Sequence, residues 1–149
     1  MPVSDGRYEP IWDPDASGVV EVGIDIIEIA RIARTLDRFG ARFLQRVFSE
    51  KEREWFGRRP AELAARFAAK EATMKALGTG VRGVHWRDIE VLSNRRGKPI
   101  LVLHETAARR AEVLGLTHFS VSLTHSRTEA MATVVAYQGG RSFEEKTQG

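Results

Sequence analysis

One helical segment, residues 60–77, constrains the fold more than any other part of the chain. Pro60 suits the first position of a helix, and Gly78 suits the position just after its end. At ~100° per residue, the apolar side chains of this segment form one narrow stripe, which consists of Leu63, Phe67, Met74 and Leu77. An apolar stripe must be covered by other elements, so we expect this helix to be central to the fold.

The first half of the chain predicts one strand and several helices. Residues 19–26 (VVEVGIDI) favour a strand with two different faces, one with Val20, Val22 and Ile24 and the other with Glu21, Gly23 and Asp25. A helix is expected over residues 28–39, and the same periodicity resumes after Gly40 and continues to Val47. Ser49 followed by Glu52 is a capping-box pattern, which begins a short helix that ends at Gly57.

The second half predicts strand pairs around one helix. Residues 88–92 and 99–103 flank the turn segment SNRRGK and predict a β-hairpin. A helix over residues 107–114 is followed by two strands, 118–125 and 128–137. This order predicts an α+β fold with antiparallel strands packed on the long central helix. We expect one domain over residues 19–138, between a flexible extension (1–18) and a flexible tail (139–149).

The amino-acid composition excludes several classes of protein. The chain has 149 residues, 42% hydrophobic and 29% charged, which suits one globular domain. It has no cysteine, which excludes disulfides, thiolate nucleophiles and cysteine-ligated metal sites. No apolar run approaches the ~20 residues that cross a bilayer, and the acidic N-terminus is unlike a signal peptide. We therefore expect a cytoplasmic protein without membrane association.

Two carboxylates on separate elements are candidate metal ligands. Asp25 lies near the end of the first predicted strand, and Glu71 lies beside the apolar stripe with Lys75 one turn further on. Mg²⁺ takes one or two protein carboxylates and completes its shell with water and phosphate oxygens, so the set suits phosphate-ester or pyrophosphate chemistry. Simpler roles remain open here, namely an i,i+4 salt bridge for Glu71 with Lys75 and a cap for Asp25.

Lys70 departs from the pattern around it. It falls near the centre of the apolar stripe, where a lysine must snorkel, pair with an anion or lose its charge. Departures of this kind tend to mark functional sites. On the shoulder of the stripe beside Glu71, the small residues Ala64 and Ala68 leave room for another chain or a ligand.

Two motifs carry a resemblance to a known family. GID at residues 23–25 and RFAAKEATMKALGTG at residues 66–80 resemble the paired signature of the 4′-phosphopantetheinyl transferase superfamily. EIARI, RVFSEKE, GKPILVL and VSLTHS support it. The similarity covers roughly residues 19–137 and is closest to the short holo-[acyl-carrier-protein] synthase type, whose fold we therefore expect.

The resemblance implies a reaction and its participants. It implies Mg²⁺-dependent transfer of 4′-phosphopantetheine from coenzyme A to a serine of an apo-acyl carrier protein, with release of adenosine 3′,5′-bisphosphate, within fatty acid biosynthesis and lipid metabolism. It assigns the metal to Asp25 and Glu71 and phosphate stabilisation to Lys75. Glu71 would accept the serine proton, directly or through a water on the metal. A homotrimer with active sites between subunits is expected.

Three further residues are assigned to coenzyme A by the same resemblance. They are His125, Arg66 and Gly78. A histidine at a strand end more often has a hydrogen-bonded structural role, but the matching family position contacts coenzyme A. Many relatives read SLSH where this chain reads SLTH, and Thr124 keeps the hydroxyl group.

Arginines recur every three or four residues in the first helical region. Arg31, Arg34, Arg38, Arg42 and Arg46 would form one continuous stripe if the helix is not sharply broken at Gly40. A charge run is usually a solvated face, but a face of nearly pure arginine fits a nucleic-acid backbone or an acidic protein surface. Carrier proteins are acidic, and the family docks them on this helix, so we assign the stripe to carrier recognition.

Two alternative functions can be distinguished by experiment. A small nucleic-acid-binding module would use the arginine stripe, but it leaves Asp25, Glu71 and Lys75 without a role and lacks interleaved aromatic residues. A different Mg²⁺-dependent phosphoesterase would release adenosine 3′,5′-bisphosphate without any carrier. The sequence does not choose among fatty-acid, polyketide and peptide-synthetase carriers.

Overall fold

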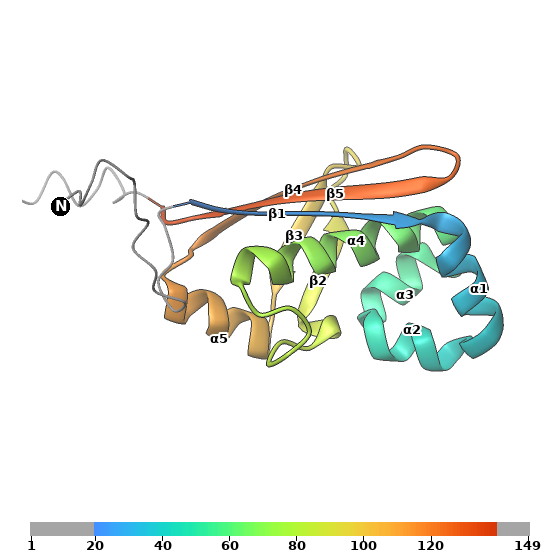
Figure 1. Ribbon diagram of the computed structural model, residues 1–149, viewed down its shortest axis with the longest axis horizontal. Coiled ribbons are helices and arrows are strands. Elements are labelled where there is room, and N and C mark those ends of the chain that lie inside the picture. Colours follow the sequence, from blue (N-terminus) through green and yellow to red (C-terminus); the bar gives the residue numbers. More distant parts are fainter. Residues whose placement is uncertain (1–19, 140–149) are drawn as a thin grey trace, which may run out of the picture.

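The computed structural model describes residues 20–139 as a three-stranded sheet packed on one long helix (Figure 1). The predicted extension at residues 1–18 and, apart from Gly139, the predicted tail lie outside the described residues. The sheet has the order β1-β5-β4, and all of its pairs are antiparallel. The strands are β1 (Val20–Glu28), β4 (His118–His125) and β5 (Glu129–Tyr137).

Helix α4 (Pro60–Leu77) covers one face of this sheet and contacts all three strands. Its buried alanines, Ala64, Ala65, Ala68, Ala69, Ala72 and Ala76, let the strands approach closely. At Gly23 a Cβ atom would lie only 1.7 Å from the carbonyl oxygen of Ala72, so only glycine fits where β1 meets α4. Ala64 and Ala68 are completely buried within the chain, so the expected free space beside Glu71 is not present.

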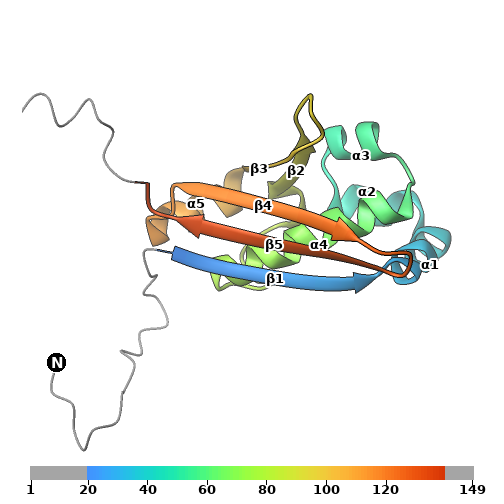
Figure 2. The ribbon, with the colours of Figure 1, turned by 90° about the horizontal axis from the view of Figure 1, so that it is seen from above.

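The other elements flank this central layer (Figures 1 and 2). Helices α1 (Ile29–Phe39), α2 (Ala41–Val47) and α3 (Glu50–Phe56) gather at one end, and α5 (Glu105–Leu114) lies at the other. The hairpin of β2 (Ile89–Ser93) and β3 (Pro99–Leu103) follows a 3-10 turn, η1 (Trp86–Asp88). The predicted α+β architecture is confirmed, with strand and helix bounds that differ by a few residues. None of the described helices is long and apolar enough to cross a membrane.

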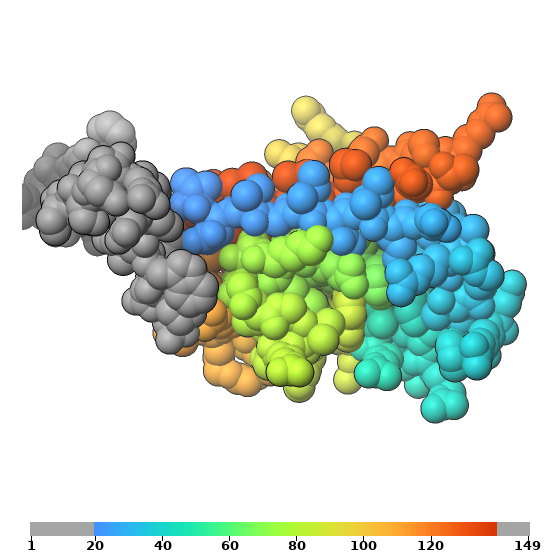
Figure 3. Space-filling model, viewed as in Figure 1, coloured from blue at the N-terminus to red at the C-terminus, as the bar shows by residue number. Residues whose placement is uncertain are grey.

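The two faces of β1 are placed opposite to what an apolar alternation ordinarily indicates. Gly23 and Ile27 are buried against α4, and Asp25 shares their face. The apolar side chains Val20, Val22, Ile24 and Ile26 point outward and are each more than half exposed. Among residues 20–139, the apolar face of β1 is therefore the outer one, and β1 (blue) lies along the molecular surface in the space-filling view (Figure 3).

Gly40 divides the predicted arginine helix in two. Its φ of 51° ends α1 and turns the chain before α2 begins. The five arginines therefore do not form one continuous stripe. Arg31, Arg34 and Arg38 belong to α1, whereas Arg42 and Arg46 belong to α2.

Candidate active site

Asp25 and Glu71 meet where β1 passes over α4. Asp25 lies on the face of β1 that is turned toward the helix. The close contact between Gly23 and Ala72 fixes the distance between the two backbones and so brings the neighbouring carboxylates together. The two predicted metal ligands, although far apart in the sequence, therefore lie in one cluster.

Lys75 completes this cluster through Asp25. Its Nζ donates to Oδ1 of Asp25 at 3.1 Å and to the carbonyl oxygen of Ile24 at 2.8 Å. The Lys75 side chain is 56% exposed, whereas that of Asp25 is 12% exposed. Lys75 thus forms its ion pair with Asp25 of β1 and not with Glu71. Asp25 does not cap α1, since β1 continues to Glu28 before that helix begins.

The pKa of Glu71 is raised to about 7. Partial burial is the main cause, and the nearby Asp25 carboxylate raises the pKa further through a shared hydrogen bond and through its charge. Lys75 and Arg31 oppose the shift with their positive charges. Two carboxylates this close require a proton or a cation between them, so the site is suited to bind a cation.

The donor set fits Mg²⁺ bound together with a phosphate ligand. Oδ2 of Asp25 is buried and has no hydrogen-bond partner among the described residues, so one hard oxygen is left to bind a ligand. No group of three or more metal-binding side chains occurs within residues 20–139. Mg²⁺ commonly takes one or two carboxylates and fills its octahedron with water and substrate phosphates. Asp25 and Glu71 are sufficient for that mode of binding.

His125 and Arg66 lie together at a different place in the fold. Both line a cavity of about 360 Å³. Arg66 and Glu71 are five residues apart on α4, so their side chains leave the helix about 140° apart. The structure therefore does not bring His125 and Arg66 into the carboxylate cluster of the same chain. Arg59, Ser93 and Pro99 also line this cavity, and sequence reasoning did not single them out.

Arg66 is held firmly at the wall of that cavity. Its guanidinium donates to the carbonyl oxygen of Val91, to Ser93 and to Glu62, and it lies 3.4 Å from the ring centroid of Phe56. Burial lowers the pKa of Arg66, although Glu62 opposes this. His125 is exposed, with Nδ1 3.2 Å from the carbonyl oxygen of Ser126. A ligand in the cavity can therefore reach His125 more freely than Arg66.

Gly78 ends α4, one turn beyond the cluster. Its φ of 71° is in the left-handed region, and its N–H is bonded to carbonyl oxygens of the last turn. Arg110 from α5 donates to the carbonyl oxygen of Leu77 and so ties this helix end to α5. Gly78 comes three residues after Lys75 and twelve residues after Arg66 along the chain.

Four of the five arginines of α1 and α2 border two separate hollows, whereas Arg38 lies over the ring of Phe39, 5.1 Å from its centroid. Arg31 and Arg34 line a cavity of about 350 Å³ beside the end of β1. Arg42 and Arg46 line a second one of about 370 Å³. We call this second hollow the α2 groove; its other walls are Thr35, Phe39, Phe43, Val47 and Trp86. All five arginines are exposed to solvent.

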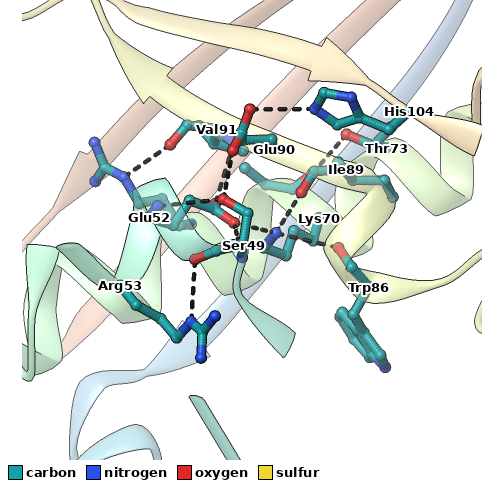
Figure 4. A network of polar contacts seen from close by, with 12 residues as sticks. Ser49, Glu52, Arg53, Lys70, Thr73, Trp86, Ile89, Glu90, Val91 and His104 are labelled. Atoms are coloured by element: carbon teal, nitrogen blue, oxygen red, sulfur yellow. Dashed lines mark hydrogen bonds and ion pairs between the residues drawn. The ribbon is translucent and has the colours of Figure 1, made fainter. Parts of the chain in front are cut away.

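A buried polar network lies on another side of α4, about 100° around the helix from Glu71, and sequence reasoning found only part of it (Figure 4). Lys70 and Glu52 are both fully buried and form an ion pair of 2.7 Å. Glu52 also accepts from the backbone N–H groups of Ser49 and Val91. The capping-box pattern locates Glu52 next to Ser49, but it gives no sign that the same carboxylate also pairs with α4.

Glu90 and His104 extend this network toward the surface (Figure 4). Ser49 and His104 are hydrogen-bonded to the Glu90 carboxylate. Burial pushes the pKa of Glu90 upward, but these hydrogen bonds outweigh it and hold the pKa below its ordinary value. Neither residue carried a sequence signal, because each contact joins segments that are distant in the chain.

Trp86 is a second feature that the sequence did not reveal. Its ring stacks on Phe67 with centroids 4.8 Å apart and planes 19° apart. It forms a wall of the α2 groove and also of a larger neighbouring hollow of about 790 Å³. Through this stacking on Phe67, the wall of the α2 groove is in contact with α4.

Comparison with known proteins identifies similar chains. A model of the 4′-phosphopantetheinyl transferase superfamily matches residues 21–134. The holo-[acyl-carrier-protein] synthase of Solibacter usitatus is 46% identical over 121 residues, which are 78% of this chain and 97% of that protein.

Solved structures agree with this similarity. The Helicobacter pylori holo-[acyl-carrier-protein] synthase in complex with coenzyme A superposes with a TM-score of 0.71 at 31% identity, covering 77% of this chain and 98% of that one. The Bacillus anthracis holo-(acyl-carrier-protein) synthase in complex with CoA (3′,5′-ADP) gives a TM-score of 0.66 at 37% identity, covering 80% and 96%. The expected fold is thereby confirmed.

Proposed function

The chain belongs to the 4′-phosphopantetheinyl transferase superfamily, and from the site that it builds we propose that it acts as a holo-[acyl-carrier-protein] synthase. It transfers 4′-phosphopantetheine from coenzyme A to a serine of an apo-acyl carrier protein and releases adenosine 3′,5′-bisphosphate. The observation that carries this conclusion is the Asp25–Glu71–Lys75 cluster, in which a buried oxygen without a partner lies near a carboxyl group of raised pKa.

Transfer requires one P–O bond to form and another to break. The serine oxygen bonds to the β-phosphorus of coenzyme A, the bond to the bridging oxygen breaks, and adenosine 3′,5′-bisphosphate leaves with the electron pair. The serine proton must pass to a base, and we assign this role to the Glu71 carboxylate of the cluster. Lys75 is half exposed and can place its ammonium group against the charge that develops on the phosphate.

Mg²⁺ would be held by Asp25 and Glu71. When bound, it supplies positive charge to the pyrophosphate oxygens of coenzyme A. The unpartnered Oδ2 of Asp25 supports this assignment, as does the proximity of Arg31 and Lys75, which add to the positive field around an anionic substrate.

Carrier binding is assigned to the arginines of α1 and α2. Although Gly40 divides them, Arg31 and Arg34 border one hollow and Arg42 and Arg46 border the α2 groove. An acidic carrier helix would meet positive charge at the rim and the apolar walls of Phe39 and Phe43 inside. The nucleic-acid-binding alternative is not supported, since the similar proteins are holo-[acyl-carrier-protein] synthases.

We infer a homotrimer with active sites between subunits, and two observations support an assembly of several chains. The outer face of β1 leaves Val20, Val22, Ile24 and Ile26 exposed, and contiguous apolar patches of this kind mark interaction sites. The cavity of His125 and Arg66 lies on another side of α4 from Glu71, which is in keeping with a coenzyme A site completed by a second chain. Light scattering after size exclusion should give three times the chain mass of 16.7 kDa.

A cytoplasmic location is proposed as well. The absence of cysteine from the full sequence is in keeping with it. Fractionation of the native host, with detection of the chain by antibody, tests this directly.

The reaction is tested by the mass of the carrier. Purified protein is incubated with coenzyme A, Mg²⁺ and an apo-acyl carrier protein, beside D25A and E71A variants and a sample with excess chelator. We expect the phosphopantetheine mass increment with the wild type in Mg²⁺ only. No increment on any of several carriers would overturn the proposal, and release of adenosine 3′,5′-bisphosphate without carrier modification would indicate a hydrolase.

A further inference from the structure

Lys70 is the buried charge that the proposed reaction does not use. All three of its N–H donors are occupied: Nζ donates to Oε1 of Glu52 at 2.7 Å, to the carbonyl oxygen of Trp86 at 3.1 Å and to that of Ile89. An ammonium group has three donors and no acceptor, so this geometry fits the charged form. The side chain thus joins α4 to α3 and to the segment from η1 to β2 (Figure 4).

Stability alone does not explain this arrangement. Two buried charges lose their hydration, and apolar residues of similar volume are often as stabilising in their place. What an apolar residue cannot do is accept or donate a directed hydrogen bond. Lys70 uses two of its three bonds to hold backbone carbonyl groups at fixed positions, which points to positioning of the segment that carries them.

The segment held in this way carries Trp86. Its carbonyl oxygen is bonded to Lys70, its ring stacks on Phe67, and the residue lines both the α2 groove and the neighbouring hollow. Trp86 lies in a turn of three residues, η1, which has no side-chain cap. Among the described residues, the side chain that is hydrogen-bonded to the backbone of Trp86 is that of Lys70.

We propose that Lys70 is a positioning residue for carrier recognition, which holds Trp86 as the wall of the α2 groove through its bonds to the Trp86 and Ile89 carbonyl groups. This inference rests on the proposed function, in which that groove receives the acyl carrier protein. Glu71, although next to Lys70 in sequence, is positioned by a different contact, that of Gly23 with Ala72. Loss of the Lys70 bonds should therefore impair carrier binding much more than coenzyme A binding.

The test is a separation of two Michaelis constants. For K70M, carrier is varied at saturating coenzyme A, and coenzyme A is varied at saturating carrier. We expect the KM for carrier to rise by about tenfold or more, as for loss of an interface anchor, while the KM for coenzyme A stays within about twofold. An unchanged KM for carrier in folded K70M, or an equal rise in both constants, overturns the inference.

A double-mutant cycle tests whether Trp86 mediates the effect. W86A removes the wall directly, so adding K70M to W86A should raise the KM for carrier little further. Additive effects of the two substitutions would contradict the inference. This readout is not moved by a merely structural role of Lys70, which would act equally in both backgrounds.

A second variant guards against failure of K70M to fold. E52Q/K70M removes both charges, so no unpaired ion is left buried, and the Gln oxygen can still accept from the Val91 N–H that Glu52 satisfies. It loses the bonds to Trp86 and Ile89 and should show the same selective rise in the KM for carrier. A wild type that does not modify the carrier refutes the proposed function, whereas an active wild type with an unaltered variant refutes only the role of Lys70.

Discussion

Lys70 and Glu71 are neighbours on α4, yet each belongs to a cluster of carboxylate and lysine with an opposite character. The Glu52–Lys70 pair is fully buried, and every hydrogen-bonding atom of Lys70 has a partner. The cluster of Asp25, Glu71 and Lys75 is partly open, with one carboxylate oxygen unpartnered and one pKa raised to about 7. A satisfied cluster fixes structure, whereas an unsatisfied one retains the capacity to bind a ligand.

The largest expected effect is on stability, from opening the buried pair. K70A leaves Glu52 charged and buried without its partner, so we expect a loss of about 3–5 kcal/mol in the free energy of unfolding. K75A is the matched control, because it removes a lysine that is 56% exposed from the same helix and should cost less than about 1 kcal/mol. Urea unfolding followed by circular dichroism measures both. Similar losses for the two variants would mean that the clusters do not differ as the structure indicates.

Activity should be more sensitive to substitutions in the open cluster than to those in the buried pair. E71A and D25A remove the proposed metal ligands, and we expect kcat/KM to fall by on the order of 10³-fold or more. The free energy of unfolding of E71A should change little, since Glu71 is only half-buried. The mass assay with carrier measures the rate. A variant that keeps more than a tenth of the wild-type rate would exclude that residue as an essential ligand.

Gly23 connects the geometry of the open cluster to backbone packing. The added Cβ of G23A would overlap the Ala72 carbonyl group, so we expect a loss of about 1–3 kcal/mol in stability and weaker Mg²⁺ binding as β1 moves away from α4. G57A is the control, because Gly57 has open space around it but a φ of 56°. It should destabilise the protein without changing Mg²⁺ affinity, measured by calorimetry. Equal Mg²⁺ affinity in G23A and the wild type would contradict the role of this contact.

Mg²⁺ affinity should weaken as the pH falls through about 7. The proton that Glu71 takes up in the metal-free protein competes with the cation, because its pKa is about 7. Below that pH we expect at most a tenfold loss of apparent affinity per pH unit. Calorimetric titrations of the wild type at pH 8, 7 and 6 measure the effect. A constant wild-type affinity over this range would refute it.

The smallest expected effect is the pH dependence of stability without metal. The folded-state pKa of Glu71 is raised, so its contribution to stability is complete below the ordinary pKa of 4.5 and is lost as the pH rises through about 7. Thermal unfolding in chelator should therefore show wild type losing stability relative to E71Q between about pH 5 and pH 7, with little further change above pH 7. The opposite slope would show that Glu71 is better accommodated as a charged group.

Much of the site was predictable because its residues carry local signals. The four-residue spacing placed Glu71 and Lys75 on one side of a helix, and Pro60 and Gly78 marked its ends. The paired motifs then added Asp25. What the spacing could not give was the partner of each charge: Lys75 pairs with Asp25 from β1, and Lys70 pairs with Glu52 from α3. These partners come from elements that are distant in the sequence, so the spacing of residues within one helix or strand cannot predict them.

The sequence by itself determined the types of element, most of their ends and the chemical kind of the site, because helix and strand periods and capping residues act over a few neighbouring positions. Only the tertiary structure decided which face of β1 turns inward, where Gly40 divides the arginines, and that His125 and Arg66 lie apart from Glu71. The physical reason is that an alternating strand has two possible inner faces. The choice between them follows from the close packing of β1 on the small residues of α4.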